Sequence, residues 1–200
     1  MGKRILRTKL CDMLGIEYPI LSAGMGPSLI GEKTGAPVAL VVAVSEAGGL
    51  GVLGAAGFTV EEMREQIREI KKLTDKPFGV DILLPAQTVR AGDEEYKGPQ
   101  DYPLGEIVKT LPKEHYEWMM KVKEEMNLPD IDTQYTGGST TMRPRAAIKT
   151  CIEEKVPLFC AGLGNPGFMV EEAHESGMKV LGISGNTRNA KRIARGGADL

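Results

Sequence analysis

The sequence predicts an α/β fold of the (β/α)8 TIM-barrel type, in which parallel strands alternate with helices. Short apolar segments alternate with segments of helical periodicity from residue 19 to residue 195. The apolar segments also lack the polar alternation of a strand with one solvated face, so we expect strands that are buried on both faces. Many of the 25 glycines stand at predicted strand and helix ends, where tight turns need them.

The first elements are two predicted strands at residues 19–24 (PILSAG) and 50–53 (LGVL). A predicted helix over residues 36–47 separates them and ends at Gly48-Gly49. Three further strands and four further helices follow the same rhythm. The strands are predicted at 77–83, 156–161 and 179–184, and the helices at 60–73, 145–154, 165–177 and 187–195.

Local signals fix where two helices begin. Thr59 and Glu62 have the spacing of a capping box, and apolar residues follow at intervals of three and four from Val60 to Leu73. Asn165 and Pro166 place a cap and a first-turn proline at the start of another helix.

The domain prediction is one incomplete barrel over residues 1–200 with a polar insertion at about 85–144. The insertion contains a predicted helix at 113–126, and we interpret it as a lid over the carboxyl ends of the strands, since long excursions are usually functional. Residues 198–200 read as the opening of a sixth strand. Because a barrel needs eight strands and about 250 residues, we expect a barrel truncated after about five βα units.

Composition excludes several classes of partner. A net charge of −2 predicts neither nucleic acid nor an anionic membrane, and the longest apolar run, 38–44, is too short to span a bilayer. Three scattered cysteines, without metal-ligand spacing, favour a reducing cytoplasm. We therefore expect a cytoplasmic protein that acts on a small molecule.

Candidate site residues stand at the strand ends. Gly24-Met25 ends the first strand, where glycine permits close approach of a planar ligand and methionine offers a soft apolar surface. Asp81 lies within an apolar strand, so its carboxylate needs a partner. That partner is a lid residue, a ligand N–H or hydroxyl, or a neighbouring structural group.

Other candidates predict little chemistry. Residues 162–167 (GLGNPG) match GxGxxG, but Ser184-Gly185-Asn186 stands where a dinucleotide site needs an acid. His115 and His174 read as surface residues, and Cys160 has no neighbouring base. The sequence thus supplies a platform for a cofactor without an acid–base constellation of its own.

Several stretches together resemble the nitronate monooxygenase family, whose superfamily includes the flavin-dependent enoyl-ACP reductases. The most specific stretch is SEAGGLGVLG at 45–54, and PFGVD at 77–81 is another. The remaining matches are at 8–20, 23–25, 180–193 and 197–199. The resemblance covers nearly the whole chain outside the insertion.

The resemblance implies a barrel that binds FMN at the strand carboxyl ends and oxidises alkyl nitronates with O2. It implies that Gly24 and Met25 lie along the flavin, that Asp81 replaces an asparagine frequent in the family, and that Asn186 makes a polar flavin contact. An ionised aspartate cannot donate a hydrogen bond as asparagine does. The catalytic histidine is expected beyond Leu200, so no catalytic residue is assigned here.

We therefore expect these 200 residues alone to be inactive and to bind FMN weakly or not at all. We also expect an unclosed sheet to expose its edges and to associate into homo-oligomers. Two alternatives stay open: an enoyl-ACP reductase of the same superfamily, and a non-enzymatic binding module or half of a split barrel.

Overall fold

The computed structural model describes residues 6–25, 38–56, 58–84, 110–128 and 143–200. The chain divides into two compact units, one formed by Met1–Tyr96 with Met142–Leu200 and the other by Lys97–Thr141. In the second unit the structure describes helix α6, Lys113–Glu125, which has no buried residue. The predicted helix at 113–126 is therefore present, whereas its role as a lid stays a prediction.

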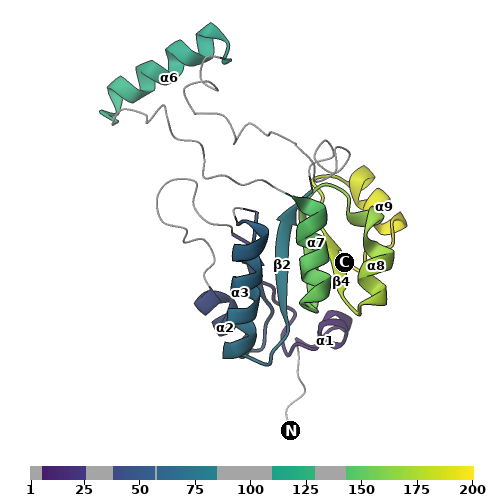
Figure 1. Ribbon diagram of the computed structural model, residues 1–200. Coiled ribbons are helices and arrows are strands. Elements are labelled where there is room, and N and C mark those ends of the chain that lie inside the picture. Colours follow the sequence, from purple (N-terminus) through teal and green to yellow (C-terminus); the bar gives the residue numbers. More distant parts are fainter. Residues whose placement is uncertain (1–5, 26–37, 57, 85–109, 129–142) are drawn as a thin grey trace. The chain divides into compact units, whose positions relative to one another are not determined.

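The first unit is built on a parallel sheet whose described strands follow the order β1-β2-β3-β4 (Figure 1). Their bounds are Gly51–Gly54, Phe78–Leu83, Leu158–Leu163 and Lys179–Gly182. Each strand pairs in parallel with the next strand in the chain, as consecutive βαβ units of a barrel do. The predicted strands at 50–53, 77–83, 156–161 and 179–184 are therefore confirmed within a few residues.

The predicted strand at 19–24 is wrong as a regular strand. Its backbone makes one isolated parallel bridge, Leu21 to Leu50, beside β1. The next ladder bond is replaced, because the backbone N–H of Val52 donates to Ser22 Oγ at 2.9 Å. A side-chain hydroxyl that takes the backbone donor competes with the ladder, and regular pairing ends there.

Residues 198–200 run beside β4, on the edge opposite β3. Asp199 and Leu200 donate their N–H groups to the Val180 carbonyl, and Gly182 N–H donates to the Leu200 carbonyl at 3.0 Å. Residues 198–200 therefore pair with β4 through these backbone hydrogen bonds, as a sixth strand would, but they do not form a regular strand.

Helix α3, Val60–Leu73, begins at the cap that the sequence predicts. Thr59 and Glu62 form a capping box at the start of α3, with N···O distances of 3.2 and 2.9 Å. The other described α-helices of the first unit are α1 Lys9–Leu14, α2 Val38–Glu46, α7 Pro144–Glu153, α8 Val170–Glu175 and α9 Thr187–Arg195.

The single helix predicted at 165–177 is divided in two. Asn165 Oδ1 accepts from Gly167 N at 3.0 Å and opens the 3-10 turn η2, Pro166–Phe168, before α8 begins at Val170. Met169 donates its N–H to the Pro166 carbonyl, three residues back. The tight i,i+3 bond therefore separates the capped turn from the α-helix.

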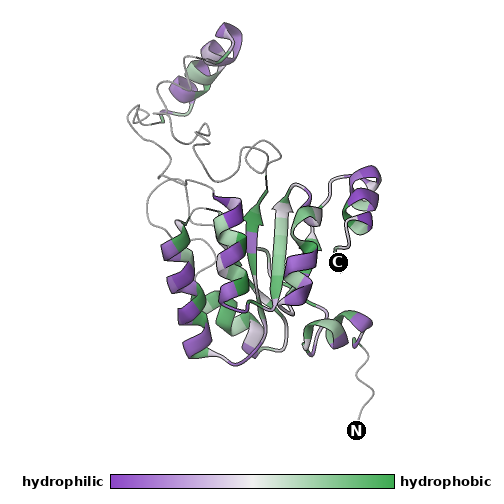
Figure 2. Ribbon diagram, turned by 45° about the vertical axis from the view of Figure 1, so that its right-hand side comes forward, coloured by the Kyte–Doolittle hydropathy of each residue, from purple (hydrophilic) through white to green (hydrophobic). Residues whose placement is uncertain are grey.

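Two apolar cores lie on opposite faces of the sheet, and Figure 2 shows that the strands are largely hydrophobic whereas the helices carry hydrophilic faces. Helices α2, α3, α7 and α8 cover one face, where Val80 and Phe159 are fully buried. The other face carries Val52, Leu158 and Cys160, and α1 packs on it from the amino-terminal end through Cys11 and Leu14. In a barrel this second face is the interior.

Candidate functional site

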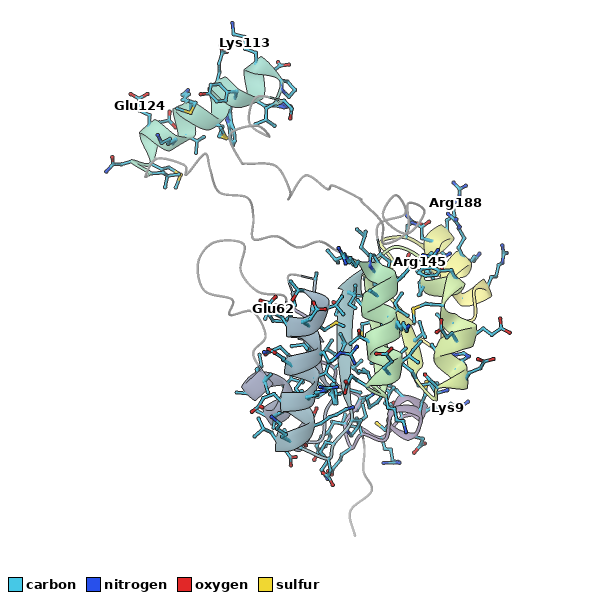
Figure 3. All side chains as sticks on the ribbon, in the orientation of Figure 1. Lys9, Glu62, Lys113, Glu124, Arg145 and Arg188 are labelled. Carbon is cyan, nitrogen blue, oxygen red and sulfur yellow. The ribbon has the colours of Figure 1, made fainter. Side chains whose placement is uncertain are left out.

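The carboxyl ends of the parallel strands meet at one edge of the sheet, which is where α/β folds place ligands. Figure 3 shows Arg145 and Arg188, at the starts of α7 and α9, toward this edge, and Lys9 at the opposite end. The sequence candidates Gly24, Asp81 and Asn186 come from the segments that lead to it.

Asp81 lies on β2 and faces the second side of the sheet, because its neighbours Val80 and Ile82 are both in the helix-covered core. In the sheet register it stands between Gly54 of β1 and Cys160 of β3. The side chain is partly buried. The Asp81 side chain therefore lies on an inner strand of the sheet, near the carboxyl ends of the strands.

Two glycines enclose this carboxyl group. A Cβ built on Gly24 would lie 2.3 Å from Asp81 Cβ and 2.7 Å from its Oδ2, and one built on Gly162 would lie 2.6 Å from Oδ1. Carbon and oxygen atoms do not approach this closely without a bond, so any side chain at either position would displace Asp81. The backbones of residues 24 and 162 therefore clamp the carboxyl group from both sides.

One oxygen of the clamped carboxyl group lacks a hydrogen-bond partner among the described residues. Burial raises the pKa of Asp81 from 3.8 to about 6, and the backbone N–H of Gly162 opposes part of that rise. This N–H does not satisfy the inner oxygen: Oδ1 is buried and has no hydrogen-bond partner among the described residues. An unpaired buried acceptor is costly, and such groups concentrate at functional sites.

Met25 and Asn186, the other two predicted site residues, are not part of the contact between Gly24 and Asp81. Met25 follows Gly24 directly and its side chain is 57% exposed, so it offers apolar surface beside the clamp. Asn186 caps α9, with its Oδ1 accepting from Asn189 N at 2.9 Å. The structure therefore brings Gly24 and Asp81 into contact, whereas Asn186 makes its hydrogen bonds to the described residues within its own turn.

A cleft of 310 Å³ opens at the same edge, between the ends of β3 and β4 and helix α9. Its apolar walls include Leu163, Ile183 and Ile193, and Asn165, Asn189 and Arg192 add polar groups. The sequence did not predict this cleft, because it depends on how α9 packs against the sheet.

The GxGxxG match has a structural explanation. Gly164 has φ +91°, and a Cβ there would lie 1.9 Å from the Leu84 carbonyl oxygen, so only glycine fits. Gly162 contacts Asp81, and Asn165 caps η2. The contact of Gly162 with Asp81 was missed by the sequence analysis, although the glycine run was its signal.

The remaining titratable candidates have other surroundings. His174 Nε2 pairs with Asp199 Oδ2 at 2.8 Å near the amino-terminal end of β4, and His115 belongs to α6 in the other unit. Cys160 is buried, and burial raises the pKa of its thiol. No group of three metal-ligating side chains occurs among the residues that the structure describes. In the same residues, no helix has the length and apolar character needed to cross a membrane.

Comparison with known proteins supplies the family. The sequence model of nitronate monooxygenase matches residues 7–200. The chain belongs to the nitronate monooxygenase family. The resemblance inferred from SEAGGLGVLG and PFGVD is therefore confirmed, and the family is one of flavin-dependent oxidoreductases.

Curated relatives agree with this assignment. Probable nitronate monooxygenases of Staphylococcus aureus (strain MSSA476) and Staphylococcus haemolyticus are 26% and 27% identical over 194 residues each. Both alignments cover 96% of this chain, and they cover 47% and 46% of the two relatives. The chain thus spans about half the length of the curated relatives that it matches.

Solved structures confirm the fold class. FabK from Thermotoga maritima is 30% identical with a TM-score of 0.62, over 96% of this chain and 42% of that protein. Nitroalkane oxidase from Streptomyces ansochromogenes is 22% identical with a TM-score of 0.60, over 96% and 47%. The α/β fold of this chain is that of part of a TIM barrel, as the sequence predicted.

Proposed function

We propose that this chain forms the first part of the FMN site of a flavin-dependent oxidoreductase that oxidises alkyl nitronates with O2. The carrying observation is the clamped carboxyl group of Asp81, which lies at the carboxyl edge of a barrel sheet with an unpaired buried oxygen. The matching family model supports a flavin there.

The residues at this edge suit a planar heteroaromatic ring. Gly24 and Gly162 keep the backbone close to Asp81, and the exposed thioether of Met25 is a soft apolar contact for a ring face. The carboxyl group of Asp81 and the amide N–H2 of Asn186 supply polar contacts. We propose that Gly24, Met25, Asp81 and Asn186 hold the isoalloxazine and its ribityl chain.

The protein and the cofactor divide the work. When bound, the flavin supplies the electron transfer that oxidation of a nitronate requires. The residues of this chain bind and orient the ring, and the apolar walls formed by Leu163 and Ile183 limit water at its edge. We propose that the histidine acting on the substrate lies outside residues 1–200, as the family resemblance implies.

FMN retention tests this proposal. The purified chain is mixed with FMN and desalted, and its visible absorption spectrum is recorded. We expect weak retention or none, and restored retention when the chain is fused after Leu200 to the segment of the S. aureus relative that follows its matched region. In the fusion, Asp81→Ala should weaken retention, whereas Asp75→Ala, on a side chain 90% exposed, should not. A colourless fusion would contradict the proposal.

The 30% identity to FabK supports a second candidate function, that of an enoyl-ACP reductase of the same superfamily. The two candidates differ in what reduces the flavin. Anaerobic bleaching of the fusion's flavin by NADPH or NADH would favour the reductase, and O2 consumption with an alkyl nitronate would favour the monooxygenase. Full flavin retention by the 200-residue chain alone would instead favour half of a split barrel.

A further inference from the structure

The two oxygens of the Asp81 carboxyl group have different surroundings. Oδ1 is sealed from solvent and has no hydrogen-bond donor among the described residues. Asp81 as a whole is only partly buried, and Oδ1 is the one atom of it that is buried and unpaired. The group is therefore open to solvent, or to a ligand, on the side of Oδ2.

No described side chain facing this group carries a positive charge. The segment before β1 presents Gly24, β1 presents Gly54, and β3 presents Cys160 and Gly162. The one titratable group among these is the Cys160 thiol, whose pKa is raised by burial and by the charge of Asp81. Among the described residues, the backbone N–H of Gly162 favours the ionised form of Asp81 in part, but Oδ1 keeps no hydrogen-bond partner and no ion pair is formed.

The neutral acid suits these surroundings better than the carboxylate. An ionised carboxyl group would leave negative charge on Oδ1, where neither water nor a donor reaches it, and this is costly. In the neutral acid, Oδ1 is the carbonyl oxygen and Oδ2 carries the proton. The O–H then points to the open side, where it can donate to a ligand. Carboxylic acids that stay neutral in apolar sites act as hydrogen-bond donors in this way.

We propose that Asp81 binds its ligand as the neutral acid and donates a hydrogen bond from Oδ2 to an acceptor, a carbonyl oxygen or ring nitrogen, of a planar heteroaromatic ligand. This inference rests on the proposed function, from which it takes FMN as the ligand. Asp81 then does in this chain what an asparagine N–H2 would do at the same position. A ligand that covers Oδ2 removes its remaining solvent and favours the proton further.

The proposal predicts that binding takes up a proton at neutral pH. Burial raises the pKa of Asp81 to about 6 without a ligand, so about nine-tenths of the population is ionised at pH 7 and must take up a proton to bind as the neutral acid. If only the neutral acid binds, affinity falls by about tenfold per pH unit above that pKa. A ligand that donated to the carboxylate would show the opposite trend, with affinity falling in acid.

The test measures FMN affinity of the fusion protein against pH, by quenching of flavin fluorescence from about pH 5.5 to pH 8.5. Calorimetry in two buffers of different ionisation enthalpy counts the protons taken up. Asp81→Asn is the matched variant, because its amide donates at every pH. We expect binding to weaken more steeply with rising pH, and to take up more protons, in the wild type than in Asp81→Asn, where the FMN phosphate is left to titrate in this range. Asp75→Asn should behave as the wild type.

Affinity that rises with pH, proton release on binding, or the same pH profile in Asp81→Asn would overturn the proposal. A second measurement does not need FMN. The carboxyl carbon of Asp81, labelled with carbon-13 in the 200-residue chain, should titrate near pH 6. A midpoint below about 4, the range of an ordinary aspartate, would overturn the proposal even where the flavin assignment holds. Failure of FMN to bind at any pH would instead overturn the proposed function.

Discussion

A Cβ on Gly24 would lie 2.3 Å from Cβ of Asp81, so the segment before β1 and the middle of β2 meet at a point that admits no side chain. Gly24→Ala must therefore displace either Asp81 or the segment at 20–25. Overpacking of this kind costs about 1–3 kcal/mol. Urea unfolding should show that loss, and Gly185→Ala is the control, because nothing lies within 4 Å of a Cβ at Gly185. Equal stability of the two variants would contradict the contact.

Asp199 ties the segment after α9 to the start of β4, and this network should make stability depend on pH. Its carboxyl group accepts from Val180 N at 2.9 Å, from His174 Nε2 at 2.8 Å and from Lys179 Nζ at 3.1 Å. The Val180 N–H, His174 and Lys179 lower the pKa of Asp199 against the opposing effect of burial. A carboxyl group with a lowered pKa in the fold stabilises it above the ordinary pKa, and that contribution is lost as pH falls through the folded pKa.

Asp199→Asn should therefore be less stable than the wild type at pH 7 by about 1–3 kcal/mol, since a charge-assisted acceptor is replaced. The difference should shrink as the pH falls below about 4, where the wild-type carboxyl group also takes up a proton. Urea unfolding at pH 7 and at pH 3 measures both values. A difference that stays constant with pH would show that the charge of Asp199 contributes nothing.

The capping box of α3 gives a prediction that needs no ligand. Thr59 Oγ1 accepts from Glu62 N, and Glu62 Oε2 accepts from Thr59 N. Thr59→Ala removes one of these bonds and should lower the free energy of unfolding by about 1 kcal/mol. Thr59→Ser keeps the hydroxyl and should retain most of the stability. The same loss in both variants would assign the effect to the threonine methyl group.

What the sequence predicted well depends on short-range chemistry. Residues that lie close together along the chain determine the capping box at Thr59, the helices that end at glycine and the strands that are buried on both faces. For Gly24 and Asp81 the sequence predicted only that both lie near the same edge of the sheet, since parallel strands bring their carboxyl ends together. It did not predict that the two residues are in contact.

What the sequence did not predict depends on contacts between distant segments. The Ser22 hydroxyl replaces a ladder bond to Val52, thirty residues away, and no local pattern shows that competition. Gly162 was noticed within a GxGxxG pattern, but its role against Asp81 follows from the register of β2 and β3. The cleft beside α9 likewise needs the packed positions of two strands and a helix.

Gly164 and Gly177 differ in why glycine is needed: both have a positive φ, but only Gly164 of the two also lacks space for a side chain. Both have positive φ, +91° and +84°, so alanine at either position carries the strain of the left-handed conformation, about 1–2 kcal/mol. At Gly177 a Cβ meets nothing within 4 Å, whereas at Gly164 it would lie 1.9 Å from the Leu84 carbonyl oxygen. The chain after β2 is held there, because Leu84 N–H donates to the Leu163 carbonyl at 2.8 Å.

Gly164→Ala should therefore destabilise the chain clearly more than Gly177→Ala, because the new methyl group must separate Leu84 from Leu163. It should also weaken FMN retention in the fusion protein, since Leu163 and Gly164 line the cleft at the carboxyl edge. Gly177→Ala should leave retention unchanged, because Gly177 follows α8 at the amino-terminal side of β4. Urea unfolding and desalted flavin spectra of both variants measure the two effects. Equal destabilisation would mean that the left-handed backbone conformation alone accounts for Gly164.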